Sequence, residues 1–150
     1  MQNRARAEQD AAGNLGTEIR TIRVKNDAED FAGNYNVHDS VPGLVFNYTQ
    51  AISVDNAVNN RVHFDRFGDY ANNTSIYATK LGSGALELPS QTAVDIGSGA
   101  GSCDIATHVF QGTNFTATSN GFVLVYTDAK TAPVSCAGAA TTGTATYTKQ

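Results

Sequence analysis

Five apolar residues near the N-terminus recur at helical spacing, and this period constrains the fold more than any other feature of the chain. They fall three or four residues apart, with Glu8 in the one polar position of the series, and are Ala5, Ala12, Leu15, Ile19 and Ile22. The pattern predicts a helix from about Gln2 to Asn26 with one narrow apolar stripe. Gly13 and Gly16 each cost about 1 kcal/mol relative to alanine in a helix, so we expect the segment to need packing against the rest of the domain.

The period changes to two after position 60, which is typical of strands. Val62 and Phe64 alternate with polar residues, and Phe122 to Tyr126 is a continuous apolar run expected to be buried on both faces. Further strands are expected over 75–81, 85–88 and 143–149. A short helix is expected over 102–111, because Ser102 can serve as its N-cap and Gly112 as its stop.

These elements predict a single α+β domain over residues 1–150. A long N-terminal helix (1–26) would pack on one antiparallel sheet, and a connector (27–60) would link it to the sheet and a disulfide region (61–150). Within the connector, Phe31 and Tyr35 are expected to anchor an Asn- and Gly-rich segment. The stretch from Gly43 to Asn60 is expected to hold a short helix, followed by a loop or an edge strand.

The composition favours an exported β-rich protein. Charged residues make up only 16% of the chain, and Asn, Thr, Ser and Gly supply the remaining polarity. The net charge of -4 argues against duplex nucleic acid as a partner, because such binding needs a clustered positive surface. No apolar stretch reaches the length of a membrane span. We expect that an apolar N-terminal segment preceded Gln2, so that the membrane is reached only through that missing part.

Two cysteines, Cys103 and Cys136, are compatible with one disulfide or with two free thiols. Their spacing does not match a zinc or redox motif, which favours the disulfide and an oxidising compartment.

Several local motifs suggest chemistry weakly, and a structural role explains each of them better. They are a His38-Asp39-Ser40 trio, a His63/Asp65 pair, a calcium-like loop over 65–69 and a glycine-rich stretch over 97–101. Each lacks the partner residues that its chemistry requires. We therefore predict no catalytic residue, no metal site and no cofactor.

Four stretches together resemble the type IVb pilins, the class of toxin-coregulated, bundle-forming and conjugative thin-pilus subunits. They are the N-terminal helix up to Val24, the stretch from Gly43 to Ala57, the Cys103 segment up to Phe110, and Cys136 followed by Thr142 to Ala145. The likeness covers most of the chain in order, although each motif is loose. The family's apolar N-terminal stretch, with its methylated first residue, is absent.

The resemblance implies a pilin fold closed by a Cys103–Cys136 disulfide. It also implies a structural subunit of an extracellular filament on a bacterial surface, used for adhesion, aggregation or conjugative contact. Other copies of the subunit would be partners and would assemble through the N-terminal helix, which would then be the spine or assembly helix of the filament. The remaining partners would be the pilus assembly machinery and a receptor on a host or recipient cell.

Two other functions remain open. The first is a minor pilin or pilus-tip adhesin that binds a glycan or a receptor. The second is a small secreted hydrolase or inhibitor, suggested only by His38, His63 and His108.

Overall fold

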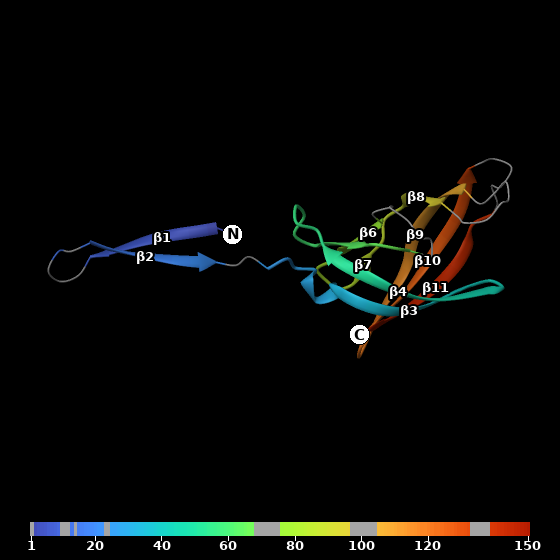
Figure 1. Cartoon of the computed structure of the whole chain (residues 1–150), viewed down its shortest axis with the longest axis horizontal. Coiled ribbons are helices and arrows are strands. Elements are labelled where there is room, and N and C mark those ends of the chain that lie inside the picture. The colour runs from blue at the N-terminus through green and yellow to red at the C-terminus, as the bar shows by residue number, and fades with distance from the viewer. Residues whose placement is uncertain are drawn as a thin grey trace.

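The chain folds into β-structure throughout the part that the computed structural model describes, which is residues 2–9, 13, 15–22, 25–67, 76–96, 105–132 and 139–150. Side chains are described for 13, 25–67, 76–93, 107–130 and 139–150. A nine-stranded antiparallel sheet has the strand order β7-β6-β5-β4-β3-β11-β10-β9-β8, and β1 and β2 form a separate two-stranded sheet (Figure 1). The only helical element among these residues is a 3-10 turn, η1 (Glu29–Phe31).

The strand bounds follow the chain from the N-terminus to the C-terminus. They are β1 (Gln2–Gln9), β2 (Leu15–Ile22), β3 (Gly33–Val41), β4 (Leu44–Val54), β5 (Arg61–Phe64), β6 (Ile76–Lys80), β7 (Leu86–Glu87), β8 (Gln91–Ile96), β9 (Ile105–Thr118), β10 (Gly121–Ala132) and β11 (Thr141–Lys149). No helix in the described residues is long and apolar enough to cross a membrane.

Aromatic side chains fill the inside of the curled sheet. Residues that alternate along each strand point inward, as on β3, where Tyr35, Val37 and Asp39 are buried and their neighbours are exposed. Ring contacts link the core across non-adjacent strands; for example, the rings of Phe64 on β5 and Tyr147 on β11 meet edge to face with their centroids 5.9 Å apart. The inner face is the hydrophobic core, and the outer face is open to solvent.

The two ends of the sheet approach each other through side-chain and loop contacts. The Gln91 side chain accepts a hydrogen bond from the Tyr77 amide at 2.9 Å and donates one to the Tyr77 carbonyl at 2.7 Å. The Gly112 amide also donates to the Leu88 carbonyl at 2.9 Å. These bonds bring β6 and β7 close to β8 and β9, so the sheet curls into a half-barrel around its core.

The predicted α+β fold with its N-terminal spine helix is wrong. Residues Gln2–Gln9 and Leu15–Ile22 form an antiparallel hairpin in which Ala5 lies opposite Ile19. Gly13, in the turn, has a φ of +85°, a conformation that a helix does not allow. The β-branched residues in the second half of the segment, Thr17, Ile19, Thr21 and Ile22, favour a strand over a helix.

Of the five residues assigned to the assembly helix, four lie in these strands. Ala5 belongs to β1, and Leu15, Ile19 and Ile22 belong to β2, so they form no helical stripe. Ala12 lies outside the described residues.

The predicted connector over 27–60 is also wrong, since β3 and β4 occupy most of it. The alternation of buried and exposed positions cannot be recognised from the sequence of this stretch, because Asp39 and Gln50 occupy buried positions where an apolar residue is expected. The short helix expected over 102–111 is also wrong for residues 105–111, which belong to β9, where His108 and Phe110 point into the core, and residues 102–104 lie outside the described part of the chain.

The strands expected in the C-terminal half are confirmed as β5, β6, β7, β10 and β11. The run from Phe122 to Tyr126 is buried on one face only, because Val123 and Val125 are half-exposed on the outer side. Cys103 and Cys136 lie outside the described residues, so their disulfide stays a prediction.

Candidate functional site

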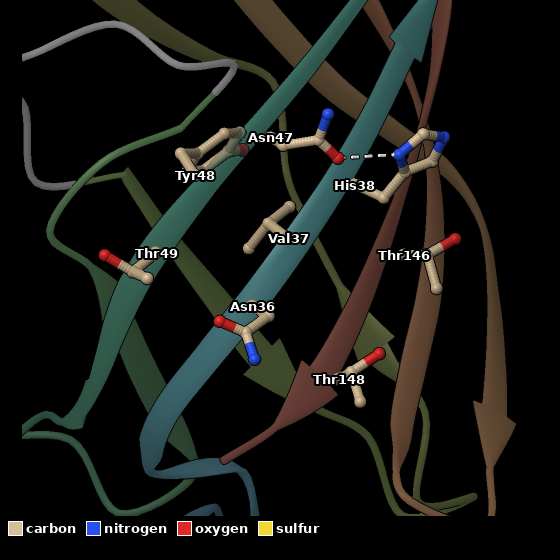
Figure 2. A pocket seen from close by; sticks show the side chains of 8 residues that line it. All are labelled: Asn36, Val37, His38, Asn47, Tyr48, Thr49, Thr146 and Thr148. Atoms are coloured by element: carbon tan, nitrogen blue, oxygen red, sulfur yellow. Dashed lines mark hydrogen bonds between the residues drawn. The ribbon is translucent and has the colours of Figure 1, made fainter.

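A shallow hollow lies on the outer face of the sheet, over its three central strands. Its volume is about 360 Å³, and polar side chains of β3, β4 and β11 surround it (Figure 2). The residues that line it are Asn36, Val37, His38, Asn47, Tyr48, Thr49, Thr146 and Thr148. Val37 and Tyr48 are buried and point inward, so the polar members form the accessible surface.

Strand register arranges the polar residues in two straight rows. One row is Thr146, His38 and Asn47, which lie opposite one another on β11, β3 and β4. The other row is Thr148, Asn36 and Thr49. Neighbouring strands lie about 4.8 Å apart, and alternate residues along a strand are about 7 Å apart, so the six side chains form a regular grid.

A hydrogen bond fixes the orientation of His38 within this grid. Its Nδ1 lies 2.9 Å from the Asn47 amide oxygen, as the dashed line in Figure 2 shows. An amide oxygen can only accept, so Nδ1 donates and Nε2 of the neutral ring is an acceptor. In the second row the Gln150 amide donates to the Asn36 side-chain oxygen at 2.9 Å. Three of the six polar side chains, those of His38, Asn47 and Asn36, are therefore held in place.

The tight β3–β4 turn sets the register that creates the rows. Pro42 and Gly43 separate the two strands, and Gly43 has a φ of +83°, which favours glycine. Val41 therefore lies opposite Leu44, and the pairs that face outward are Ser40/Val45, His38/Asn47 and Asn36/Thr49. A shift by one residue would bury the polar side chains and expose Tyr35 and Val37.

All the side chains that line the hollow are uncharged when His38 is neutral. The threonine hydroxyls and asparagine amides each donate and accept hydrogen bonds. Such a surface offers paired donors and acceptors but has no fixed charge with which to attract an ion.

A second polar cluster surrounds Asp55 at the end of β4 and holds the turn to β5. Its carboxylate accepts the Ala57 amide at 2.7 Å and the Val58 amide at 3.1 Å, and lies 2.9 Å from His63 Nε2. The hydrogen bond to His63, followed by the backbone bond from Ala57, lowers the pKa of Asp55 from 3.8 to about 2. Arg61 Nη1 lies 3.9 Å from this carboxylate. These contacts hold the turn between β4 and β5 in place, so the cluster has a structural role.

Two further acidic residues, Asp128 and Asp39, pair with buried side chains of the inner face. His108 is fully buried on β9, and its Nδ1 is 2.7 Å from Asp128 on β10. Asp39 is fully buried on β3, and its carboxylate accepts a hydrogen bond from the hydroxyl of Tyr126. Burial, and then the charge of Asp39, raises the pKa of the Tyr126 hydroxyl.

The structure separates the residues that the sequence suggested for catalysis or metal binding. His38 and Ser40 point outward while Asp39 between them is buried, so the trio does not converge. His63 contacts Asp55, whereas the Asp65 carboxylate accepts the Ala51 amide at 3.0 Å.

The three histidines lie on different strands and in different environments. Within the described part of the chain, no three His, Cys, Asp or Glu side chains gather in a metal-binding arrangement. The glycine-rich stretch over 97–101 falls outside that part, as does the calcium-like loop beyond Phe67.

Sequence reasoning missed the outer grid. A signal was present in the alternation of Thr142, Thr144, Thr146 and Thr148 at the C-terminus, which places four hydroxyl side chains on one face of a strand. The contributions of β3 and β4 could be found only after both were recognised as strands.

Comparisons of the chain with protein-family models, with curated proteins and with solved structures gave no match.

Proposed function

We propose that this chain is a non-catalytic, extracellular binding module that holds a neutral, hydroxyl-rich ligand such as a glycan on its outer sheet face. The observation that carries the proposal is the uncharged grid of donors and acceptors around the hollow. Each sugar hydroxyl donates and accepts a hydrogen bond, as do the threonine and asparagine side chains of the grid. A charged ligand would find no opposite charge there.

The shallow form of the hollow implies weak binding. A ligand on an open sheet face keeps much of its hydration and displaces ordered water from the grid. Dissociation constants on the order of 0.1–1 mM are therefore expected for a short oligosaccharide. Tighter attachment would require several copies of the module acting together.

The filament-subunit function stays a prediction, but one of its supports has been removed. The spine helix through which subunits were expected to assemble is a β-hairpin in the structure. The binding module was the alternative among the functions implied by the family resemblance, and it needs no such helix.

Titration of the 15N-labelled chain with neutral oligosaccharides tests the proposal. Amide shifts are expected to cluster at Asn36, His38, Asn47, Thr146 and Thr148. Replacement of Asn47 by alanine should weaken binding roughly tenfold, because it removes one partner of the ligand and releases His38.

The matched control is Thr92→Ala, which truncates an exposed threonine on β8, three strands away from β11. This variant should bind as the wild type does. Shifts that appear only with charged oligosaccharides, or that lie away from the grid for every ligand tried, would refute the proposed site.

A further inference from the structure

The polar grid continues beyond the hollow of Figure 2 into a third row of residues. The row comprises Gln150, Asn34, Ala51 and Asp65, from the C-terminal end of β11 across β3 and β4 to the end of β5. Asn34 lies opposite Ala51 in the register, and its carbonyl accepts the Gln150 amide at 3.0 Å. The Asp65 amide donates to the Ala51 carbonyl at 3.2 Å. All four residues are exposed, and Asn34 and Ala51 lie two positions from the second row, so they face outward as that row does.

A second hollow, about 290 Å³ in volume, lies over this third row. Ala51 has the smallest side chain of the row, and the longer side chains of Asn34, Thr49 and Asp65 stand around it. The short methyl group therefore accounts for the depression. Thr49 lines both this hollow and the first one, so the two adjoin on the outer face. We call the two hollows together the outer groove.

Asp65 has the only charged side chain among the described residues that line the outer groove, when His38 is neutral. Its Oδ1 accepts the Ala51 amide at 3.0 Å, which holds the carboxylate at the edge of the second hollow. No described residue donates a hydrogen bond to its Oδ2. A carboxylate accepts stronger hydrogen bonds than a neutral oxygen does. Asp65 is therefore suited to accept a hydrogen bond from a hydroxyl group of a bound ligand.

We propose that the outer groove binds a linear, neutral oligosaccharide of several sugar units, with Asp65 accepting hydroxyl hydrogen bonds at one end. The inference rests on the proposed function and specifies the length and direction of its ligand. From Asn47 to Ala51 the groove runs about 14 Å along β4, which is longer than one sugar ring. Acidic sugars are disfavoured, because their carboxylates would repel Asp65.

The length of the groove predicts how affinity depends on the length of the ligand. A chain that covers both hollows loses its translational and rotational freedom only once, so each further sugar unit adds contacts at little extra cost. Affinity should therefore rise from a disaccharide to a hexasaccharide by roughly tenfold or more. A ligand confined to the first hollow would gain nothing from added length.

Titration of the 15N-labelled chain with cellobiose and cellohexaose, and with maltose and maltohexaose as a second linkage, tests this prediction. The hexasaccharide of at least one linkage should shift the amides of Ala51, Asp65 and Gln150 as well as those of His38 and Asn47. It should also bind roughly tenfold more tightly than its disaccharide.

Two variants change the second hollow alone. Ala51→Gln fills it with a longer side chain, and Asp65→Asn removes the charge but keeps an oxygen for the Ala51 amide. Each should remove most of the gain that the hexasaccharide has over the disaccharide. The matched control is Ala140→Gln, at an exposed alanine beside the opposite end of β11 from Gln150, and it should keep the full gain. Circular dichroism spectra of all three variants should match the wild type.

The possible failures are distinguishable. Hexasaccharides that shift only the residues around His38 and bind no more tightly than disaccharides would overturn the extended groove and leave the proposed function intact. A gain with length that survives in both Ala51→Gln and Asp65→Asn would also overturn it, since the added units would then lie elsewhere. The absence of shifts with all four sugars would overturn the proposed function and this inference with it.

Discussion

The hydroxyl of Tyr126 lies 2.9 Å from each carboxylate oxygen of Asp39, although the two residues belong to strands that are not neighbours. β11 runs between them, and its Gly143 lies opposite Tyr126 in the register. A Cβ atom at Gly143 would come within 2.4 Å of the tyrosine ring. Because Gly143 has no side chain, the Tyr126 ring can extend over β11. Its hydroxyl then donates a hydrogen bond to the buried Asp39 carboxylate on β3.

Replacement of Tyr126 by phenylalanine should lower the free energy of unfolding by about 2–3 kcal/mol. The loss arises because the buried Asp39 carboxylate loses a hydrogen-bond donor while the ring still packs. Urea unfolding at neutral pH measures the effect. The control is Tyr77→Phe, because the hydroxyl of Tyr77 makes no hydrogen bond within the described residues. An equal loss of stability in both variants would contradict the role given to the contact between Tyr126 and Asp39.

Replacement of Gly143 by alanine should also destabilise the chain, by about 1–3 kcal/mol, because the added methyl group displaces the Tyr126 ring. Gly82→Ala is the matched control, since a Cβ there meets nothing within 4 Å. The control should change stability by less than about 0.5 kcal/mol. If the two alanine variants unfold at the same urea concentration, the close approach of Gly143 and Tyr126 is wrong.

Acid should weaken the fold partly through Asp55. Its folded-state pKa is depressed from 3.8 to about 2, so the stability it contributes is present above pH 4 and is lost as the pH falls toward 2. An Asp55→Asn variant should be less stable at pH 7 and should lose less on acidification over this range.

NMR titration of the Asp55 carboxyl group checks the cause. His63→Leu should raise the pKa of Asp55 toward its ordinary value, because it removes the largest lowering contact. A pKa of Asp55 that stays near 2 in this variant would assign the shift to the backbone amides of Ala57 and Val58 instead.

The predicted Cys103–Cys136 disulfide should stabilise the chain by about 3–4 kcal/mol, since it closes a long loop. Peptide mapping without reductant should recover the two cysteines as one linked pair. Cys103→Ser should lower the melting temperature in oxidising buffer and remove its dependence on reductant. Two thiols that both react with a maleimide in the native protein would contradict the disulfide.

The sequence predicted the C-terminal strands well, because their inward positions are apolar. Phe122, Leu124 and Tyr126 alternate with smaller residues, and Val62 with Phe64 does the same. It failed on β3 and β4, where Asp39 and Gln50 are buried at positions that the pattern treats as exposed. The burial of Asp39 depends on a hydrogen bond from Tyr126, which is 87 residues away in the chain.

The helix predicted for the N-terminal segment is wrong for another reason. The three- and four-residue spacing of its apolar residues predicts a helix, although Gly13 and Gly16 weaken helices and the β-branched residues after position 16 favour a strand. The outer grid could not be predicted before the strands were aligned, since His38 and Asn47 become neighbours only through the register of β3 with β4. Local pattern identified five of the eleven strands, and long-range pairing determined the site.

The seam between β6 and β8 has a consequence for how the domain opens. There the Gln91 amide takes the place of a peptide group, bonding to both the amide and the carbonyl of Tyr77. Rotation of one flexible side chain breaks both bonds, whereas separating two laddered strands breaks many at once. Transient local opening of the native state should therefore begin at this seam between β6 and β8. Solvent or a small apolar probe such as xenon would enter the aromatic interior there first.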